Sequence, residues 1–166
     1  MTSPAKVLYL DYDGVLHDED VWRSPKRGIY VGTPGRVLFE WTSILEALLE
    51  PYPEVRIVLS TSWVRVFSFN FARKQLTPSL QNRVIGATFH RREMRKDWFA
   101  LLPRGVQVLE DVERRRPARW FAIDDDPFGW PSYAINRVVV TEGRRGLSDA
   151  SAQEAVKSML EAISKG

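Results

Sequence analysis

The stretch LYLDYDGVLHDED, residues 8–20, places Asp11 and Asp13 on either side of one tyrosine, directly after an apolar run. Residues i and i+2 of a strand lie on the same face, so two aspartates at this spacing repel each other in an extended chain. Either the chain bends after Asp11, which Gly14 makes easy, or a cation lies between the carboxylates. Carboxylate and backbone carbonyl oxygens suit Mg²⁺, but Asp and Gly are also ordinary turn residues. These residues alone leave both a metal site and an acidic turn open.

Strand-like and helix-like segments alternate along the rest of the chain. Short continuous apolar runs, typical of buried strands, occur at 6–10, 55–60, 83–89, 119–123 and 137–140. Apolar residues at helical spacing predict helices over 36–50, 66–76 and 104–115. A last helix, which includes residues 152–163, is predicted to begin at Ser148 as its cap. This alternation predicts a three-layer α/β, Rossmann-like fold with a central parallel sheet.

Polar residues follow three of the predicted strands. The first ends at Asp11 and Asp13, the second at Ser60 and Thr61, and the fourth at Asp124 and Asp125. Ligands of open parallel sheets bind at the carboxyl ends of the strands. Polar residues at the carboxyl ends of three predicted strands favour a metal site over a simple turn. We therefore expect the Asp11 strand in the middle of the sheet, beside the strands that end at Thr61 and Asp124.

Length and composition limit the class of protein. With 166 residues and 44% apolar composition, we expect one compact domain over residues 1–166. The chain has no apolar run long enough to span a membrane and no leader-like start, so we expect a soluble, cytoplasmic protein. The absence of cysteine excludes disulfides, thiolate catalysis and cysteine-bound zinc. Two histidines, His17 and His90, are too few for a histidine-rich site, so oxygen atoms must supply most of the ligands of any metal.

The positive charges are mostly arginine and are clustered. The formal net charge is only +3, but arginines gather in HRREMR (90–95), ERRRPAR (113–119) and EGRRG (142–146). The rigid guanidinium fork favours phosphate and carboxylate partners, which suggests an anionic substrate. The alternative is that these runs are solvated faces balanced by nearby acidic residues.

Four short motifs, in this order, resemble those of the haloacid dehalogenase-like (HAD) phosphohydrolases. They are LDYDGVL at 10–16, IVLST at 57–61, Arg104 within LPRGVQVLEDV, and WFAIDDD at 120–126. The order and rough spacing agree from about residue 6 to 141. The short sequences STSW, RVIGAT, RG and IDDD, in this order, also resemble those of the small HAD-like domains associated with bacterial RNA-repair proteins.

The resemblance implies a Mg²⁺-dependent phosphomonoester hydrolase with an aspartyl-phosphate intermediate. Asp11 would be the nucleophile. Asp13 would protonate the leaving oxygen and later take a proton from the attacking water. Mg²⁺ would be bound by Asp11, the backbone carbonyl of Asp13, and Asp124 or Asp125. A cation between them explains how the like charges of the opening stretch are tolerated.

The phosphate-binding positions have alternatives. Thr61 is the expected partner of a phosphoryl oxygen, with Ser60 as a competitor, and Thr61 could instead cap the following helix. Arg104 is expected to clamp the phosphate, although Arg95 and Lys96 also precede the DDD segment. Many members of the family carry Lys at the third motif, where this chain would use Arg.

The substrate is expected to be a macromolecular phosphate, either a polynucleotide end or a phosphoprotein. Larger family members close over small metabolites with a cap domain, whereas residues 17–35 can form only a short flap or loop insertion.

One alternative function is a non-enzymatic nucleic-acid-binding or RNA-repair accessory module, whose binding would depend on the arginines and tryptophans. Another is a phosphate-accepting signalling domain, which would not need Asp13. The six tryptophans are expected to pack in the core rather than to stack on bases.

Overall fold

Five parallel strands form the central sheet in the computed structural model, which describes residues 4–165. The strands are β1 (Lys6–Leu10), β4 (Val55–Leu59), β5 (Val84–Ala87), β6 (Arg119–Asp124) and β7 (Val138–Val140). Their order is β5-β4-β1-β6-β7, with every neighbouring pair parallel. The predicted position of β1 in the middle of the sheet, between β4 and β6, is confirmed.

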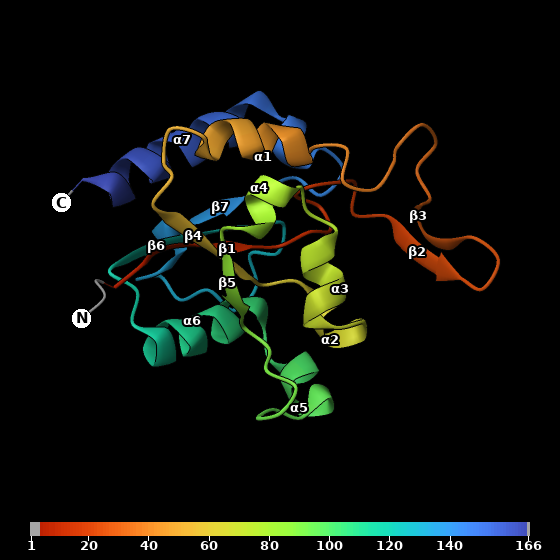
Figure 1. Ribbon diagram of the computed structural model, residues 1–166, viewed down its shortest axis with the longest axis horizontal. Coiled ribbons are helices and arrows are strands. Elements are labelled where there is room, and N and C mark those ends of the chain that lie inside the picture. Colours follow the sequence, from red (N-terminus) through yellow and green to blue (C-terminus); the bar gives the residue numbers. More distant parts are fainter. Residues whose placement is uncertain (1–3, 166) are drawn as a thin grey trace.

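Helices cover both faces of this sheet (Figure 1). The pair α1 (Thr42–Leu49) and α7 (Ala150–Ser164) lies on one face, and α6 (Arg104–Arg115) lies on the other. The shorter helices are α2 (Ser62–Val66), α3 (Phe69–Lys74), α4 (Pro78–Gln81) and α5 (Lys96–Leu101), with 3₁₀ turns η1 (Ile135–Arg137) and η2 (Gly146–Ser148). None of the described helices has both the length and the apolar character needed to cross a bilayer. The predicted three-layer α/β fold is confirmed.

The apolar core is divided between the two faces of the sheet because alternate residues of a strand point to opposite sides. From β1, Leu8 and Leu10 join the larger cluster, which contains the apolar faces of α1 and α7. Val7 and Tyr9 join the smaller cluster on the α6 side. All four side chains are fully buried, as expected of the central strand of a doubly covered sheet.

A hairpin follows the first strand within residues 17–35. It consists of β2 (Val21–Ser24) and β3 (Gly28–Val31), which pair antiparallel. The hairpin projects from one end of the molecule, away from the sheet (Figure 1). It presents an exposed Trp22 side chain together with the cationic side chains of Arg23, Lys26 and Arg27.

Three predicted helix boundaries are wrong. The helix predicted over 36–50 begins only at Thr42, because Phe39 adopts a left-handed conformation with φ +57° that a helix cannot contain. The segment 66–76 is split, since the Ser68 hydroxyl accepts the Phe71 N–H and starts α3 separately from α2. The cap of α7 is Asp149, whose carboxylate accepts the N–H of Ser151 at 3.1 Å. Ser148 instead ends a 3₁₀ turn and donates its hydroxyl to the Arg145 carbonyl.

Candidate active site

The strand register brings three polar residues to one edge of the sheet. Leu10 pairs with Leu59 on β4 and with Ile123 on β6. The next residue of each strand is Asp11, Ser60 or Asp124, so these three lie side by side. Backbone bonds hold this row, with Asp11 N–H donating to the Ile123 carbonyl at 3.2 Å and Ser60 N–H to the Leu10 carbonyl at 2.8 Å.

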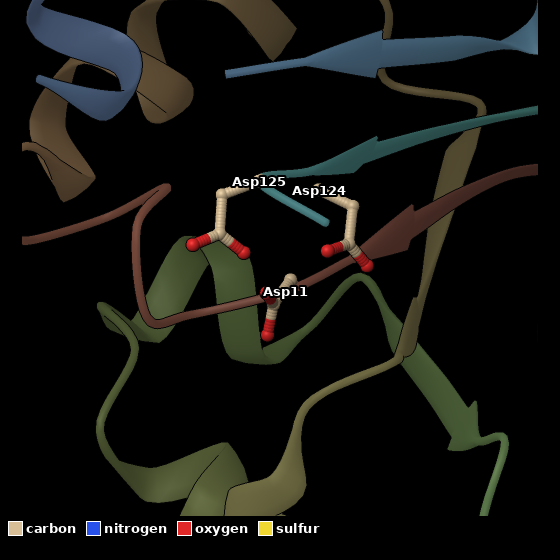
Figure 2. A group of neighbouring side chains, drawn as sticks. All are labelled: Asp11, Asp124 and Asp125. Atoms are coloured by element: carbon tan, nitrogen blue, oxygen red, sulfur yellow. The ribbon is translucent and has the colours of Figure 1, made fainter. Parts of the chain in front are cut away.

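Three carboxylates converge at this edge. One carboxylate oxygen from each of Asp11, Asp124 and Asp125 lies within 4.8 Å of the other two, and Figure 2 shows the side chains pointing toward a common space. Asp11 and Asp124 are buried, and burial raises the pKa of both carboxyls. Burial, with the neighbouring charge of Asp124, raises the pKa of Asp125 to about 6. Hard oxygen donors with uncompensated negative charge fit a divalent cation such as Mg²⁺.

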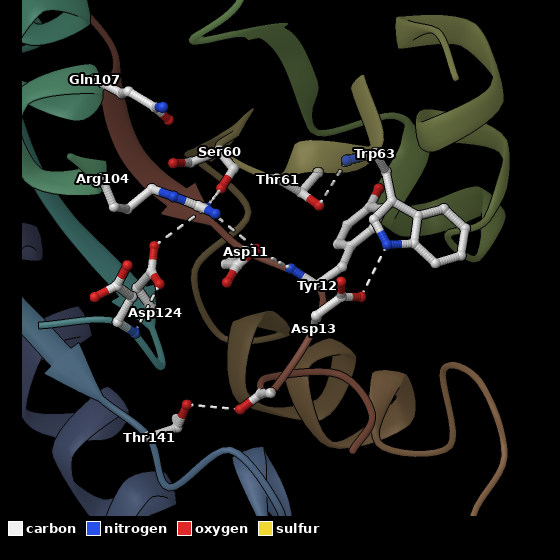
Figure 3. Close-up of polar contacts among 12 residues, drawn as sticks. Asp11, Tyr12, Asp13, Ser60, Thr61, Trp63, Arg104, Gln107, Asp124 and Thr141 are labelled. Carbon is white, nitrogen blue, oxygen red and sulfur yellow. Dashed lines mark hydrogen bonds and ion pairs between the residues drawn. The ribbon is translucent and has the colours of Figure 1, made fainter. Parts of the chain in front are cut away.

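Arg104 places a positive charge beside these carboxylates. Its Nη1 lies 3.2 Å from Asp11 Oδ1 and 3.3 Å from Asp124 Oδ2, and it also donates to the Ser60 carbonyl (Figure 3). Burial lowers the pKa of Arg104, but the neighbouring carboxylates, Asp11 and Asp124 foremost, together outweigh this effect, so the net pKa is raised and the guanidinium stays charged. Arg104 is the first residue of α6, whereas Arg95 and Lys96 are exposed. The structure therefore brings Arg104, and not Arg95 or Lys96, to the site.

The chain turns sharply after Asp11, and Gly14 allows the turn. Gly14 has φ +79°, and a Cβ at this position would lie 2.1 Å from Asp125 Oδ2. A glycine is required here both for the backbone conformation and for the close approach of Asp125. The Gly14 carbonyl accepts the Thr141 hydroxyl at 2.7 Å, which fixes the turn to the segment after β7. Asp11 and Asp13 consequently do not share a strand face.

Asp13 is held by two donors that bind the same oxygen. His17 Nε2 and Trp63 Nε1 each lie 2.8 Å from Asp13 Oδ1. His17 is fully buried, while about a third of the Asp13 side chain is exposed. Neither partner of Asp13 was predicted from the sequence. The only available signal was local: His17 follows Asp13 by four residues within the same turn.

Ser60 and Thr61 contribute in different ways at the end of β4. The Thr61 hydroxyl oxygen accepts the Trp63 N–H at 3.3 Å and caps α2, and this leaves the hydroxyl proton free to donate elsewhere. Ser60 binds Arg104 through its carbonyl, while its own hydroxyl oxygen is buried and bonds to no group in residues 4–165.

A comparison with protein families matches residues 7–152 to the HAD domain in Swiss Army Knife RNA repair proteins. The chain belongs to this family of HAD domains. The match covers most of the chain and agrees with the predicted resemblance. It places the protein among HAD-type phosphohydrolases and related modules. Comparisons with curated proteins and with solved structures each gave no significant match.

A small polar cavity opens beside Arg104 in this HAD domain. Its volume is about 180 Å³, and its wall includes Thr61, Ser62, Arg65, Arg104 and Gln107. Gln107 is tied to the α5 end of the cavity, because its amide donates to the carbonyls of Phe99 and Leu102 at 3.0 and 3.1 Å. Hydroxyl and guanidinium donors therefore line a space that adjoins the carboxylate cluster.

Proposed function

We propose that this HAD domain is a Mg²⁺-dependent phosphomonoester hydrolase that acts through an aspartyl-phosphate on Asp11. The observation that carries the proposal is the pairing of two different carboxylates two residues apart. Asp11 is buried against Arg104 and the Asp124–Asp125 pair, which suits a nucleophile facing a phosphoryl group. Asp13 is partly exposed and hydrogen-bonded to His17 and Trp63, which suits proton transfer.

In the first step, a carboxylate oxygen of Asp11 attacks phosphorus and the bond from phosphorus to the leaving oxygen breaks. The electron pair of that bond goes to the leaving oxygen, which takes a proton from Asp13. In the second step, water attacks the phosphorus, Asp13 accepts the proton of the water, and the bond from phosphorus to Asp11 breaks. Inorganic phosphate leaves and both aspartates return to their starting forms.

The neighbouring residues would bind different oxygens of the phosphoryl group and so neutralise its negative charge. Arg104 would donate to one non-bridging oxygen, and the free hydroxyl proton of Thr61 to another. The carboxylates of Asp11, Asp124 and Asp125 and the backbone carbonyl of Asp13 would hold Mg²⁺. When bound, Mg²⁺ would reduce the repulsion between the nucleophile and the phosphate.

We further propose that the substrate is a phosphorylated polynucleotide end. The insertion after β1 is a short hairpin, so the site has room for the end of a large molecule. The hairpin carries an exposed Trp22, and the Arg27 guanidinium lies 3.6 Å from the Tyr30 ring centroid. Exposed aromatic and cationic side chains are suited to bases and phosphates. The family description, which refers to RNA repair proteins, supports the same substrate class.

The proposal is tested by a metal-dependent screen of phosphorylated oligonucleotides, phosphopeptides and an activated aryl phosphate. We expect release of phosphate with Mg²⁺, no release with a chelator, and loss of release in Asp11→Asn. Preference for phosphopeptides would overturn the substrate class but retain the reaction. Salt-sensitive nucleic-acid binding without turnover, unchanged in Asp11→Asn, would instead indicate a binding module.

A further inference from the structure

The two oxygens of the Asp13 carboxylate have different environments. Oδ1 lies 2.8 Å from both His17 Nε2 and Trp63 Nε1, and Figure 3 shows the contact with Trp63. Oδ2 has no hydrogen-bond partner within the described residues. We propose that His17 and Trp63 are positioning residues that occupy Oδ1 and so make Oδ2 the oxygen that exchanges the proton with the substrate. The inference rests on the proposed hydrolase function and adds two residues to it.

The protonation of the His17 ring follows from its two contacts. The Phe39 N–H can only donate, and it lies 3.1 Å from His17 Nδ1, so Nδ1 must be the nitrogen without a proton. A neutral imidazole carries its proton on the other nitrogen. Nε2–H therefore donates to Asp13 Oδ1. This arrangement makes His17 a fixed donor to Asp13.

The surroundings of His17 hold the ring in this orientation. The His17 ring meets the Phe39 ring edge-on at 4.7 Å between centroids, and Trp63 lies 6.0 Å away on another side. Phe39 has φ +57°, a left-handed conformation that is strained for a non-glycine residue. In this conformation its N–H donates to His17 and its ring packs on Tyr12 and Trp63, at 5.1 and 5.3 Å. These contacts offset the strain and immobilise the donor.

Occupation of Oδ1 by two donors decides where the acidic proton resides. An oxygen that already accepts two N–H bonds has little capacity left to carry a proton, so in the acid form the proton lies on Oδ2. It passes from Oδ2 to the leaving oxygen as the bond from phosphorus breaks. In the second step, Oδ2 takes the proton of the attacking water. Loss of either donor would let the carboxyl rotate and would misplace the proton.

The test compares two esters that differ in their need for a proton. An alkyl phosphate has a poor leaving group that must be protonated, and an activated aryl phosphate does not. Trp63→Phe removes the indole N–H and keeps an aromatic ring, and His17→Leu removes the imidazole donor. His17→Gln keeps an N–H donor and serves as the conservative variant. Trp41→Phe is the matched control, because Trp41 is a buried tryptophan whose side chain makes no hydrogen bond within residues 4–165.

Proton transfer by Asp13 should contribute about 10²–10⁴-fold to the rate. We expect Trp63→Phe and His17→Leu each to lower kcat/KM on the alkyl ester, which reports the steps up to cleavage of the ester, by roughly tenfold or more. Their kcat/KM on the aryl ester should change by less than about twofold, because its leaving group needs no proton. A fall in kcat alone is expected on both esters, since they share the second step. His17→Gln should recover part of the loss, and Trp41→Phe should match wild type on both esters.

Equal losses of kcat/KM on the two esters would overturn the positioning role, since they would indicate general damage to the site. Wild-type rates on the alkyl ester in both variants would overturn it as well. An inactive wild type would instead contradict the proposed function, so the two failures are distinguishable. Melting temperatures of all variants establish which of them are folded.

A second measurement tests the geometry without any substrate. The chain has only two histidines, so the imidazole ¹⁵N signals of His17 can be assigned by comparison with His90→Asn. We expect an Nδ1 shift typical of an unprotonated nitrogen and an Nε2 shift typical of a protonated one. A His17 ring with the proton on Nδ1 would overturn the inference.

Discussion

Arg104 Nη1 lies 3.2 Å from Asp11 Oδ1, so the first residue of α6 provides the charge partner of the carboxylate that directly follows β1. The same nitrogen lies 3.3 Å from Asp124. One guanidinium thus separates two buried carboxylates that would otherwise repel each other. Its removal should affect both the stability of the protein and the binding of phosphate.

We predict that Arg104→Met lowers the free energy of unfolding at pH 7 without Mg²⁺. Removal of one partner from a buried ion pair costs about 3–5 kcal/mol, because the remaining charge is left uncompensated. Arg104→Lys should lose less, since it keeps the charge but not the fork. Urea unfolding provides the measurement. The exposed Lys96→Met is the control and should stay within about 0.5 kcal/mol of wild type. Wild-type stability of Arg104→Met would contradict the assigned contact.

A second prediction compares two glycines with the same backbone conformation. Gly14 and Gly28 have φ +79° and +67°, but only Gly14 would place a Cβ against a side chain, that of Asp125. Both Gly→Ala changes should destabilise the protein by about 1–2 kcal/mol through the left-handed conformation. Only Gly14→Ala should also displace Asp125 and weaken Mg²⁺ binding, measured by titration calorimetry. Equal Mg²⁺ affinity of the two variants would argue against Asp125 as a ligand.

The effect of Mg²⁺ on stability should depend on pH. The folded pKa of Asp125 is raised from 3.8 to about 6, chiefly by burial. The folded protein therefore binds this proton more tightly than the unfolded chain, so the stabilisation from it is present below pH 3.8 and is lost as the pH rises through about 6. Mg²⁺ requires the ionised carboxylate.

Millimolar Mg²⁺ should accordingly raise the melting temperature more at pH 7 than at pH 5. Scanning calorimetry with and without Mg²⁺ at both pH values measures this difference. In Asp125→Asn the Asp125 contribution is absent, and the pH dependence of the Mg²⁺ effect should become smaller. A Mg²⁺ effect that is larger at pH 5 would contradict the carboxylate site.

A fourth prediction concerns the hairpin and the substrate. If Trp22 stacks on a base, Trp22→Ala should lose about 1–3 kcal/mol of binding, seen as a higher KM for a phosphorylated oligonucleotide. KM for an aryl phosphate should not change. Trp98→Ala is the control, because Trp98 is similarly exposed, at 65% against 58% for Trp22, but lies on α5. Equal effects of the two substitutions would remove the hairpin from the substrate-binding surface.

The sequence predicted the parallel sheet and the central place of the Asp11 strand because the apolar runs are continuous and three of them end at polar residues. The apolar runs before Asp11, Ser60 and Asp124 lie in register in the structure. The grouping of these three residues at one edge of the sheet therefore followed from the rule that the carboxyl ends of parallel strands meet there. Helix starts were less predictable. Ser148 and Asp149 are both good caps, and only the three-dimensional course of the chain determines which of them is used.

The partners of the site residues were harder to predict, because they depend on contacts between segments that are distant in the sequence. Arg104 was the expected phosphate clamp, but the sequence left Lys96 open as an alternative. In the structure α6 begins beside the Ser60 carbonyl, whereas α5 begins at the surface. Trp63 was expected to pack in the core and does so, yet its indole N–H reaches Asp13. Periodicity reports which face a side chain occupies but not the direction of one polar atom.

The central claim is that Asp11 becomes phosphorylated during turnover. The most direct test is acid-quench trapping with a phosphorylated substrate and Mg²⁺, followed by mapping of the modified peptide in wild type, Asp13→Asn and Asp11→Asn. We predict a phosphoryl group on Asp11 that accumulates in Asp13→Asn, where the attacking water lacks its base, and none in Asp11→Asn. Full turnover by Asp11→Asn, or a phosphoryl group on another residue, would contradict the account.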